Sequence, residues 1–334
     1  MHWTSEAGRM MRRRTLLSGG AASLAACALP RLVLAQGQEW PSRPVTIIAP
    51  SAPGGSLDIL SRLFGRGLQE RLNQPFVVEN RGGAGGNIGF AAVAKSRPDG
   101  YTIMIASDPL SVNPSMFSNL PFDPVRDFAP IIMIATLSQV LAVHPKVQAN
   151  TFAEFVALAR ARPNTINVGT SGNGSPGHLA LALMNLARVP LVHVPYRGAG
   201  PAVIDAIGGQ IDATIVTLPA TIAMIKQSQL RALAVTSTRR SRFAPDTPAM
   251  ADVLPGVVVD SWQAFFAPGG TPPEIIKRLN AEFTALLRTR EVTDAFETQA
   301  FEAAGGSPDD LGKFLRDEIA RLAPIITTAG IRGD

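Results

Sequence analysis

The sequence contains one cysteine in 334 residues, which excludes a fold held together by disulfides and a cysteine-rich zinc module. Aromatic side chains are scarce, with three tryptophans and two tyrosines, so we expect no stacking platform for nucleic-acid bases. The histidines beyond the N-terminal region, His144, His178 and His193, are dispersed, and no pair has the spacing of metal ligands. No apolar run after residue 35 reaches the about 18 residues that a membrane-spanning helix needs. We therefore expect a globular protein without a metal site or a cofactor.

The positive charge is concentrated at the N-terminus. The formal net charge is +5, but residues 1–35 contain five arginines and one glutamate. The remaining chain has 26 basic and 25 acidic residues, a net charge of +1. A nearly neutral chain does not indicate a nucleic acid or an anionic membrane surface as the partner.

Residues 1–35 have the pattern of a secretory signal. Arginines at 9 and 12–14 precede a short apolar run at 16–29, and small residues, Val33 and Ala35, stand at the −3 and −1 positions of the expected cleavage site. We expect cleavage after Ala35, which exports the chain. Two alternatives stay open: Arg13 and Arg14 fit a twin-arginine export signal, and residues 24–27 fit a lipoprotein box that would leave a lipid on Cys27.

After residue 40, short apolar runs alternate with segments of helical periodicity. The runs predict strands at 45–49, 76–78, 101–106, 131–135, 140–143, 166–168, 191–194, 213–216, 232–235, 257–259 and 264–267. They are continuous rather than alternating, which is typical of a sheet covered on both faces. Between them lie predicted helices, among them one announced by Ser307 and Pro308 and one capped by Thr271 with Pro272 at its first position. The pattern predicts an α/β fold with largely parallel sheets.

Three glycine-rich turns follow predicted strands and open predicted helices, at residues 50–58, 169–178 and 193–201. A fourth such turn lies at 82–87 and is also consistent with a flexible loop or a close helix–strand contact. Glycine lets the backbone approach a ligand closely, and a helix N-terminus favours an anion. Each turn is also consistent with a plain strand-to-helix connection, and Asp58 with a residue that complements the helix dipole. In the third turn, Arg197 is suited to bind a carboxylate and Tyr196 to donate a hydrogen bond.

Two enzyme interpretations of the second turn fail on specific residues. Gly172, Gly174 and Gly177 match the dinucleotide fingerprint, but the next predicted strand ends without the acidic residue that would hold the ribose. A nucleophile elbow around Ser171 would need glycine at position 173, where the chain has Asn173. A secreted α/β enzyme is therefore the weaker alternative to a binding protein.

Several motifs occur in order along the chain and together carry a resemblance. They are Pro-Gly-Gly-x-x-Asp at 53–58, Glu-Asn-Arg-Gly-Gly-Ala-Gly-Gly-Asn at 79–87, Pro-Asp-Gly-Tyr-Thr at 98–102, Ser-x-Gly-x-Gly-Ser at 171–175, His-Val-Pro-Tyr-Arg-Gly at 193–198, and Ala-Pro-x-Gly-Thr-Pro at 267–272. Over residues 40–332 the chain resembles the Bug (TctC-like) family, the solute receptors of tripartite tricarboxylate transporters.

The resemblance implies a two-lobed periplasmic binding protein of the Venus-flytrap, type II-like kind, with a mostly parallel sheet flanked by helices in each lobe. Residues 40–140 plus 262–334 would form lobe 1 and residues 141–261 lobe 2. The implied partners are a small organic acid (a di- or tricarboxylate, an amino acid or an aromatic acid) and the membrane permease subunits of the transporter. A monomer is expected, and a receptor for a signalling partner is the alternative.

The resemblance also implies that a ligand carboxylate is held by facing strand-to-helix turns. Carried over residue by residue, the site consists of Ser51, Ala52, Pro53, Gly54, Gly55, Ser56, Asp58, Thr170, Ser171, Gly172, Asn173, Gly174, Ser175, His178, Tyr196 and Arg197. The chain departs from the family at Ser51, where an aromatic residue is common, and at Thr217 and Leu218, where acidic or amide residues are frequent. The identity of the acid therefore does not transfer from any relative.

Overall fold

The computed structural model describes residues 40–333, so the predicted signal at 1–35 and Cys27 lie outside the described residues. Ten strands form one continuous sheet with the order β2-β1-β3-β9-β4-β7-β5-β6, and β8 and β10 also pair with β4. The strands are β1 (Val45–Ala49), β2 (Phe76–Asn80), β3 (Thr102–Ser107), β4 (Phe128–Val143), β5 (Asn167–Thr170), β6 (Val192–Pro195), β7 (Ala213–Thr217), β8 (Arg231–Val235), β9 (Asp260–Pro268) and β10 (Glu302–Gly305).

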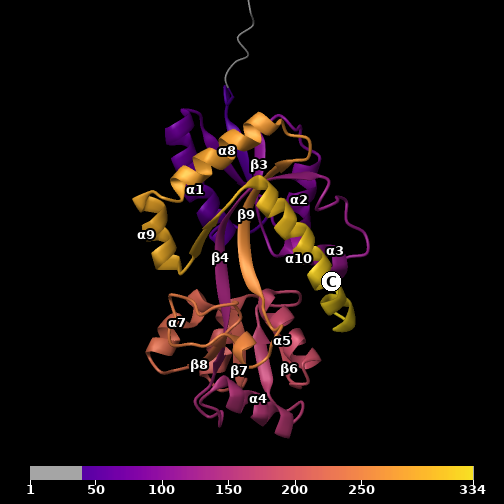
Figure 1. The fold of residues 1–334 in the computed structure, drawn as a ribbon, viewed down its shortest axis with the longest axis vertical. Coiled ribbons are helices and arrows are strands. Elements are labelled where there is room, and N and C mark those ends of the chain that lie inside the picture. The colour runs from indigo at the N-terminus through magenta and orange to yellow at the C-terminus, as the bar shows by residue number, and fades with distance from the viewer. Residues whose placement is uncertain (1–39, 334) are drawn as a thin grey trace, which may run out of the picture. The chain divides into compact units, whose positions relative to one another are not determined.

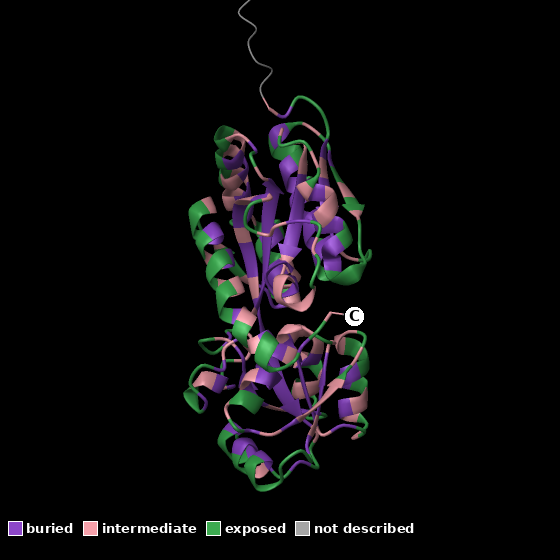
Figure 2. Ribbon diagram, turned by 90° about the vertical axis from the view of Figure 1, so that its right-hand side faces the viewer, coloured by how far each residue is buried: buried purple, intermediate pink, exposed green. Residues whose placement is uncertain are grey.

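Helices cover the sheet, with their exposed sides outward and the buried strands inside (Figure 2). They are α1 (Ser56–Leu72), α2 (Asn87–Ala94), α3 (Pro109–Met116), α4 (Phe152–Ala161), α5 (Pro176–Leu186), α6 (Ala199–Ile207), α7 (Leu218–Lys226), α8 (Pro273–Leu286), α9 (Arg290–Gln299) and α10 (Pro308–Thr328), with the short 3-10 helices η1 (Ala84–Gly86) and η2 (Met250–Asp252). Among the described residues, no helix is both long enough and apolar enough to cross a membrane.

The fold has two lobes that share β4 (Figure 1). In the first lobe, the beginning of β4 pairs with β9 and β10, and β9 pairs with β3. In the second lobe, the end of β4 pairs with β7 and β8. The predicted two-lobed α/β fold is therefore confirmed. The strands β1–β3 and β5–β7 are parallel as expected, whereas every ladder made by β4 or β9 is antiparallel.

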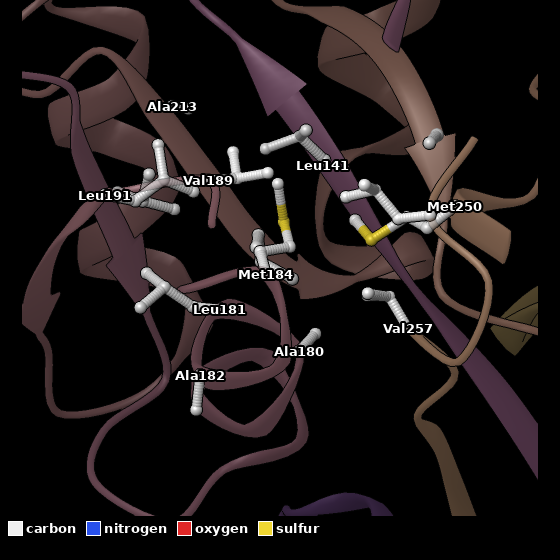
Figure 3. Close-up of a cluster of buried hydrophobic side chains, with 14 of the residues drawn as sticks. Leu141, Ala180, Leu181, Ala182, Met184, Val189, Leu191, Ala213, Met250 and Val257 are labelled. Carbon is white, nitrogen blue, oxygen red and sulfur yellow. The ribbon is translucent and has the colours of Figure 1, made fainter. Parts of the chain in front are cut away.

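The apolar side chains of each lobe form their own clusters. In the first lobe, Phe64 of α1 contacts the rings of Phe265 and Phe283 at centroid distances of 5.8 and 5.5 Å. In the second lobe, side chains of α5 such as Met184 lie beside Leu141 of β4 (Figure 3). These buried faces are the ones that the apolar periodicity of the sequence predicts.

Helix α10 packs against both lobes. Leu311 and Leu315 near its start belong to a first-lobe cluster with Trp262 of β9. Leu322 and Ile326, further along the helix, belong to the second-lobe cluster. The predicted lobe boundaries (40–140 plus 262–334, and 141–261) stay a prediction, and this packing shows that the C-terminal end of α10 contributes to the second core.

The local predictions differ from the structure at four places. The predicted strands at 131–135 and 140–143 are one strand, β4, because the polar residues between them are also paired in the ladder. Residues 257–259 are not a strand, and β10 was not predicted. The predicted cap at Thr271 is wrong: α8 begins at Pro273, and the Thr271 hydroxyl donates to the Pro268 carbonyl instead.

The start of α5 lies so close to β7 that only glycine fits there. A Cβ atom on Gly177 would stand 2.0 Å from the backbone oxygen of Ile215, which cannot move aside as a side chain would. We expect Gly177→Ala to lower the free energy of unfolding by about 3 kcal/mol, because α5 must shift away from the sheet. Urea denaturation measures this change.

Gly200→Ala is the matched control, because Gly200 lies in the first turn of α6 and a Cβ atom there meets nothing within 4 Å. We expect this variant to be equally or slightly more stable than the wild type, by less than about 1 kcal/mol. Equal stability of the two alanine variants would contradict the packing argument.

Candidate functional site

A cavity of about 710 Å³ lies between the two lobes, within the usual size range of small-molecule sites. Its first-lobe wall consists of η1, the end of β3 and helix α3. Its second-lobe wall consists of the β5–α5 turn and the β6–α6 turn. Arg332 and Gly333, which follow α10, complete the lining. Residues far apart in the sequence therefore face one space, as a ligand that joins the lobes would require.

The β5–α5 turn adopts a conformation that its glycines permit. Gly172 has φ +121° and Gly174 has φ +69°, values that residues with a Cβ atom rarely adopt. A Cβ atom on Gly174 would stand 2.3 Å from the sulfur of Met116, so the turn lies directly against the end of α3. Ser175 caps α5 by accepting a hydrogen bond from the His178 N–H at 3.3 Å.

Most N–H groups of this turn donate hydrogen bonds to nearby atoms of the same segment. The Gly172 N–H donates to the Thr170 hydroxyl, the Gly174 N–H to Nδ1 of His178, and the Ser175 N–H to the Gly172 carbonyl. Among the described residues, the loop N–H groups that remain for a ligand are those of Ser171 and Asn173. A carboxylate at this turn therefore depends on side-chain donors as well as on the backbone.

Two histidines support the turn from behind. The rings of His178 and His193 stack at a centroid distance of 3.7 Å, and Nε2 of His193 lies 2.7 Å from the Thr170 hydroxyl. Burial and the neighbouring His193 lower the pKa of His178 to about 4, and burial lowers the pKa of His193. The neutral His178 ring accepts the Gly174 N–H at 3.2 Å. We interpret this pair as a support that holds the turn.

The β6–α6 turn presents Tyr196 and Arg197 to the cavity. The Tyr196 hydroxyl donates to Asp205 at 2.7 Å, and burial together with this carboxylate raises the pKa of Tyr196 to about 12. The Arg197 side chain is exposed and has no hydrogen bond or ion pair within residues 40–333. Arg197 is therefore the donor of this turn that is available to an anion.

The β1–α1 turn, predicted as the opposite wall, has an internal network of its own. Asp58 is buried, accepts the Gly54 N–H at 2.9 Å and pairs with Arg62 at 2.9 Å. The hydrogen bond from Arg62, followed by that from Gly54, lowers the pKa of Asp58. The buried hydroxyl of Ser51 has no partner in the described chain. Asp58 thus fixes the turn, and Ser51 offers a polar group beside it.

The structure brings six of the predicted site residues to the cavity wall. They are Gly172, Asn173, Gly174, Ser175, Tyr196 and Arg197. Ten others are not among its lining residues, and their ligand role stays a prediction: Ser51, Ala52, Pro53, Gly54, Gly55, Ser56, Asp58, Thr170, Ser171 and His178. Thr170 and His178 act on the wall indirectly, through the hydrogen bonds that shape the turn.

Sequence reasoning missed Ser107 and Asp108, which line the cavity at the end of β3. The Asp108 carboxylate accepts from the Ser261 hydroxyl at 2.9 Å and from the Trp262 N–H at 3.3 Å. Burial of this carboxyl group raises its pKa to about 7. Their position at the carboxyl end of a strand parallel to β1 was the available signal, but no glycine marks this turn.

Sequence reasoning also missed Arg332, which lies far from every glycine-rich turn in the sequence and lines the cavity. Within residues 40–333, no group of three or more histidine, cysteine, aspartate or glutamate side chains is arranged to hold a metal ion. The cavity wall carries guanidinium, hydroxyl and backbone N–H groups, which are able to donate hydrogen bonds to an anion.

Comparisons with known proteins find relatives over most of the chain. A model of the tripartite tricarboxylate transporter family receptor matches residues 60–331. Protein BugT of Bordetella pertussis is 38% identical over 297 residues, which cover 88% of this chain and 91% of BugT. A solved structure of an R. palustris protein with adipate is 36% identical with a TM-score of 0.76, and covers 88% of this chain and 99% of that one. MatC from Rhodopseudomonas palustris with bound malate is 27% identical with a TM-score of 0.72, over 86% and 99% of the two chains.

The raised pKa of Asp108 predicts how stability depends on pH. Between pH 4 and 7 the folded protein keeps a proton on Asp108 that the unfolded chain releases, so the free energy of unfolding falls as pH rises. The free energy of unfolding of the wild type should fall between pH 5 and pH 8. We expect the fall to be smaller by roughly 2–3 kcal/mol in Asp108→Asn. Urea denaturation at the two pH values measures it.

Burial also raises the pKa of Asp260, so this residue contributes to the same pH dependence. Asp260 is present in both proteins, and the difference between the variant and the wild type therefore reports on Asp108. Asp294→Asn, which alters an exposed carboxyl group on α9, is the control and should keep the wild-type pH dependence. An Asp108→Asn variant with the same loss as the wild type would show that Asp108 is ionised at pH 5.

Proposed function

Because the chain belongs to the tripartite tricarboxylate transporter receptor family, we propose that it captures a small carboxylate between its lobes and delivers it to a membrane permease. The family and the fold are those of solute-binding proteins. We propose further that the chain is exported by its N-terminal signal and works as a monomer in the periplasm.

The observation that carries the proposal is the cavity between the lobes, with Arg197, which has no partner among residues 40–333, on its wall. A guanidinium group matches a carboxylate with two parallel hydrogen bonds. The N–H groups of Ser171 and Asn173 and the nearby Ser175 hydroxyl are further donors, on the β5–α5 turn. These donors are supplied by the second lobe, and the first-lobe wall faces them across the cavity.

Ligand binding would stabilise the conformation in which the two walls approach. A ligand shifts the equilibrium between open and closed lobes only by its difference in affinity for the two states. Contacts to both walls supply that difference, because they are complete only in the closed state. The strands β4 and β9 connect the lobes, and bending of these connections would accompany closure. The closed form would then be recognised by the permease.

Two solved relatives carry adipate and malate, which supports a search among small organic acids. The chain's own departures at Ser51 and Thr217 leave the choice of acid to experiment. We therefore propose di- and tricarboxylates as the first group to test, followed by amino acids and aromatic acids.

Isothermal titration calorimetry with this panel tests the proposal. We expect at least one acid to bind, and Arg197→Ala to weaken its binding roughly 10- to 100-fold, because a charge-assisted pair is lost. Arg239→Ala is the matched control, since Arg239 is an exposed arginine of the same lobe that does not line the cavity. If no acid of the panel binds, or if Arg197→Ala binds as the wild type does, the proposal is wrong.

A further inference from the structure

The segment that follows α10 is held in place on both sides of Arg332. Ile331 is buried in the second-lobe cluster, and its N–H donates to the Ile326 carbonyl at 3.0 Å. The Gly333 N–H donates to the carbonyl of Met116, the last residue of α3, at 3.1 Å. Gly333 also lies against Phe117, since a Cβ atom there would stand 2.5 Å from the ring. Arg332 therefore lies between two anchored neighbours.

Arg332 lines the same cavity as Arg197, but it comes from a different wall. Arg197 belongs to the β6–α6 turn, whereas Arg332 belongs to the segment bonded to the end of α3. Within residues 40–333, neither side chain has an ion pair or a hydrogen bond, and Arg332 is exposed. The cavity thus has two guanidinium groups that pair with no carboxylate of residues 40–333.

Among the described lining residues, Asp108 carries the one carboxyl group, and it accepts hydrogen bonds from the Ser261 hydroxyl and the Trp262 N–H. Its pKa is raised to about 7, so at neutral pH it carries only part of a negative charge. The described lining residues therefore carry a positive balance of charge, which favours a ligand with more than one negative charge.

The rest of the lining includes apolar side chains of α3 and its end. Val112, Met116 and Phe117 line the cavity together with Pro109. An apolar wall excludes a ligand with polar groups along its whole length, because those groups would lose their hydrogen bonds to water. It accepts a hydrocarbon segment between two charged ends.

We propose that the segment after α10 is part of the ligand site and that Arg332 selects for a second anionic group. The first carboxylate binds at Arg197 and the β5–α5 turn, and the second binds the Arg332 guanidinium. This assignment rests on the proposed function, because it requires that the cavity bind a carboxylate. It adds a specificity-determining residue that lies outside every strand-to-helix turn.

Calorimetry with matched acids tests the assignment. The probes are the straight-chain dicarboxylates from succinate to suberate, each paired with the monocarboxylate of the same length, for example adipate with hexanoate. We expect the wild type to prefer the dicarboxylate of its best pair. Arg332→Gln should weaken binding of that dicarboxylate roughly 10- to 100-fold and change binding of its monocarboxylate partner less than about twofold.

Two further variants make the result specific. Arg332→Lys keeps the positive charge but lacks the planar guanidinium group that donates two parallel hydrogen bonds. It should therefore retain part of the preference for the dicarboxylate. Arg288→Gln removes one positive charge from an exposed arginine outside the cavity, so it should leave both affinities unchanged. Thermal melting of each variant checks that the fold is intact.

The outcomes separate the assignment from the function on which it rests. If the wild type binds dicarboxylates and Arg332→Gln binds them equally well, the role of Arg332 is wrong while the carboxylate receptor stands. A wild type that binds both members of a pair equally also overturns the role of Arg332. If the wild type binds no acid of the series, whereas another acid of the earlier panel binds and depends on Arg197, only the assignment fails. If no acid binds at all, the proposed function fails with it.

Discussion

The hydrogen bonding of β4 is the constraint on which the two lobes depend. This strand has 16 residues, and its two halves form ladders with different partners, β9 and β10 on one side and β7 and β8 on the other. Nearly all of its residues after Ile134 are buried. A backbone N–H or carbonyl group that lost its partner there could not bond to water instead, and the loss would cost free energy of folding. The two lobes are thus joined along this strand, and the cavity lies between them.

Helix α10 links the lobes in addition to the strands β4 and β9. It packs on Trp262 in the first lobe and its Ile326 lies in the second core, so movement of the lobes must be accommodated along this helix. The segment that carries Arg332 continues directly from α10. Closure of the lobes and the position of Arg332 are therefore mechanically related, and a ligand that contacts Arg332 acts on the same element that connects the cores.

The local signals in the sequence predicted most strands because their apolar runs are short, continuous and bounded by turn residues, which is typical of buried strands. They failed where polar residues are buried by distant parts of the chain. Ser138 and Gln139 interrupt the apolar pattern of β4, yet both are buried where the strand passes between the lobes. The strand β10 lacks β-branched residues, and its pairing with β4 alone makes it a strand.

The sequence by itself determined the alternation of strands and helices, the near-neutral charge after residue 35 and the glycine turns, including those of Gly172 and Gly174. These are local properties, because periodicity and the freedom of glycine act over a few residues. Only the tertiary structure placed Asp108 against Ser261 and brought Arg332 to the cavity of Arg197. The order of strands in the sheet and the path of α10 determine which distant segments become neighbours. A local sequence pattern contains no information about either.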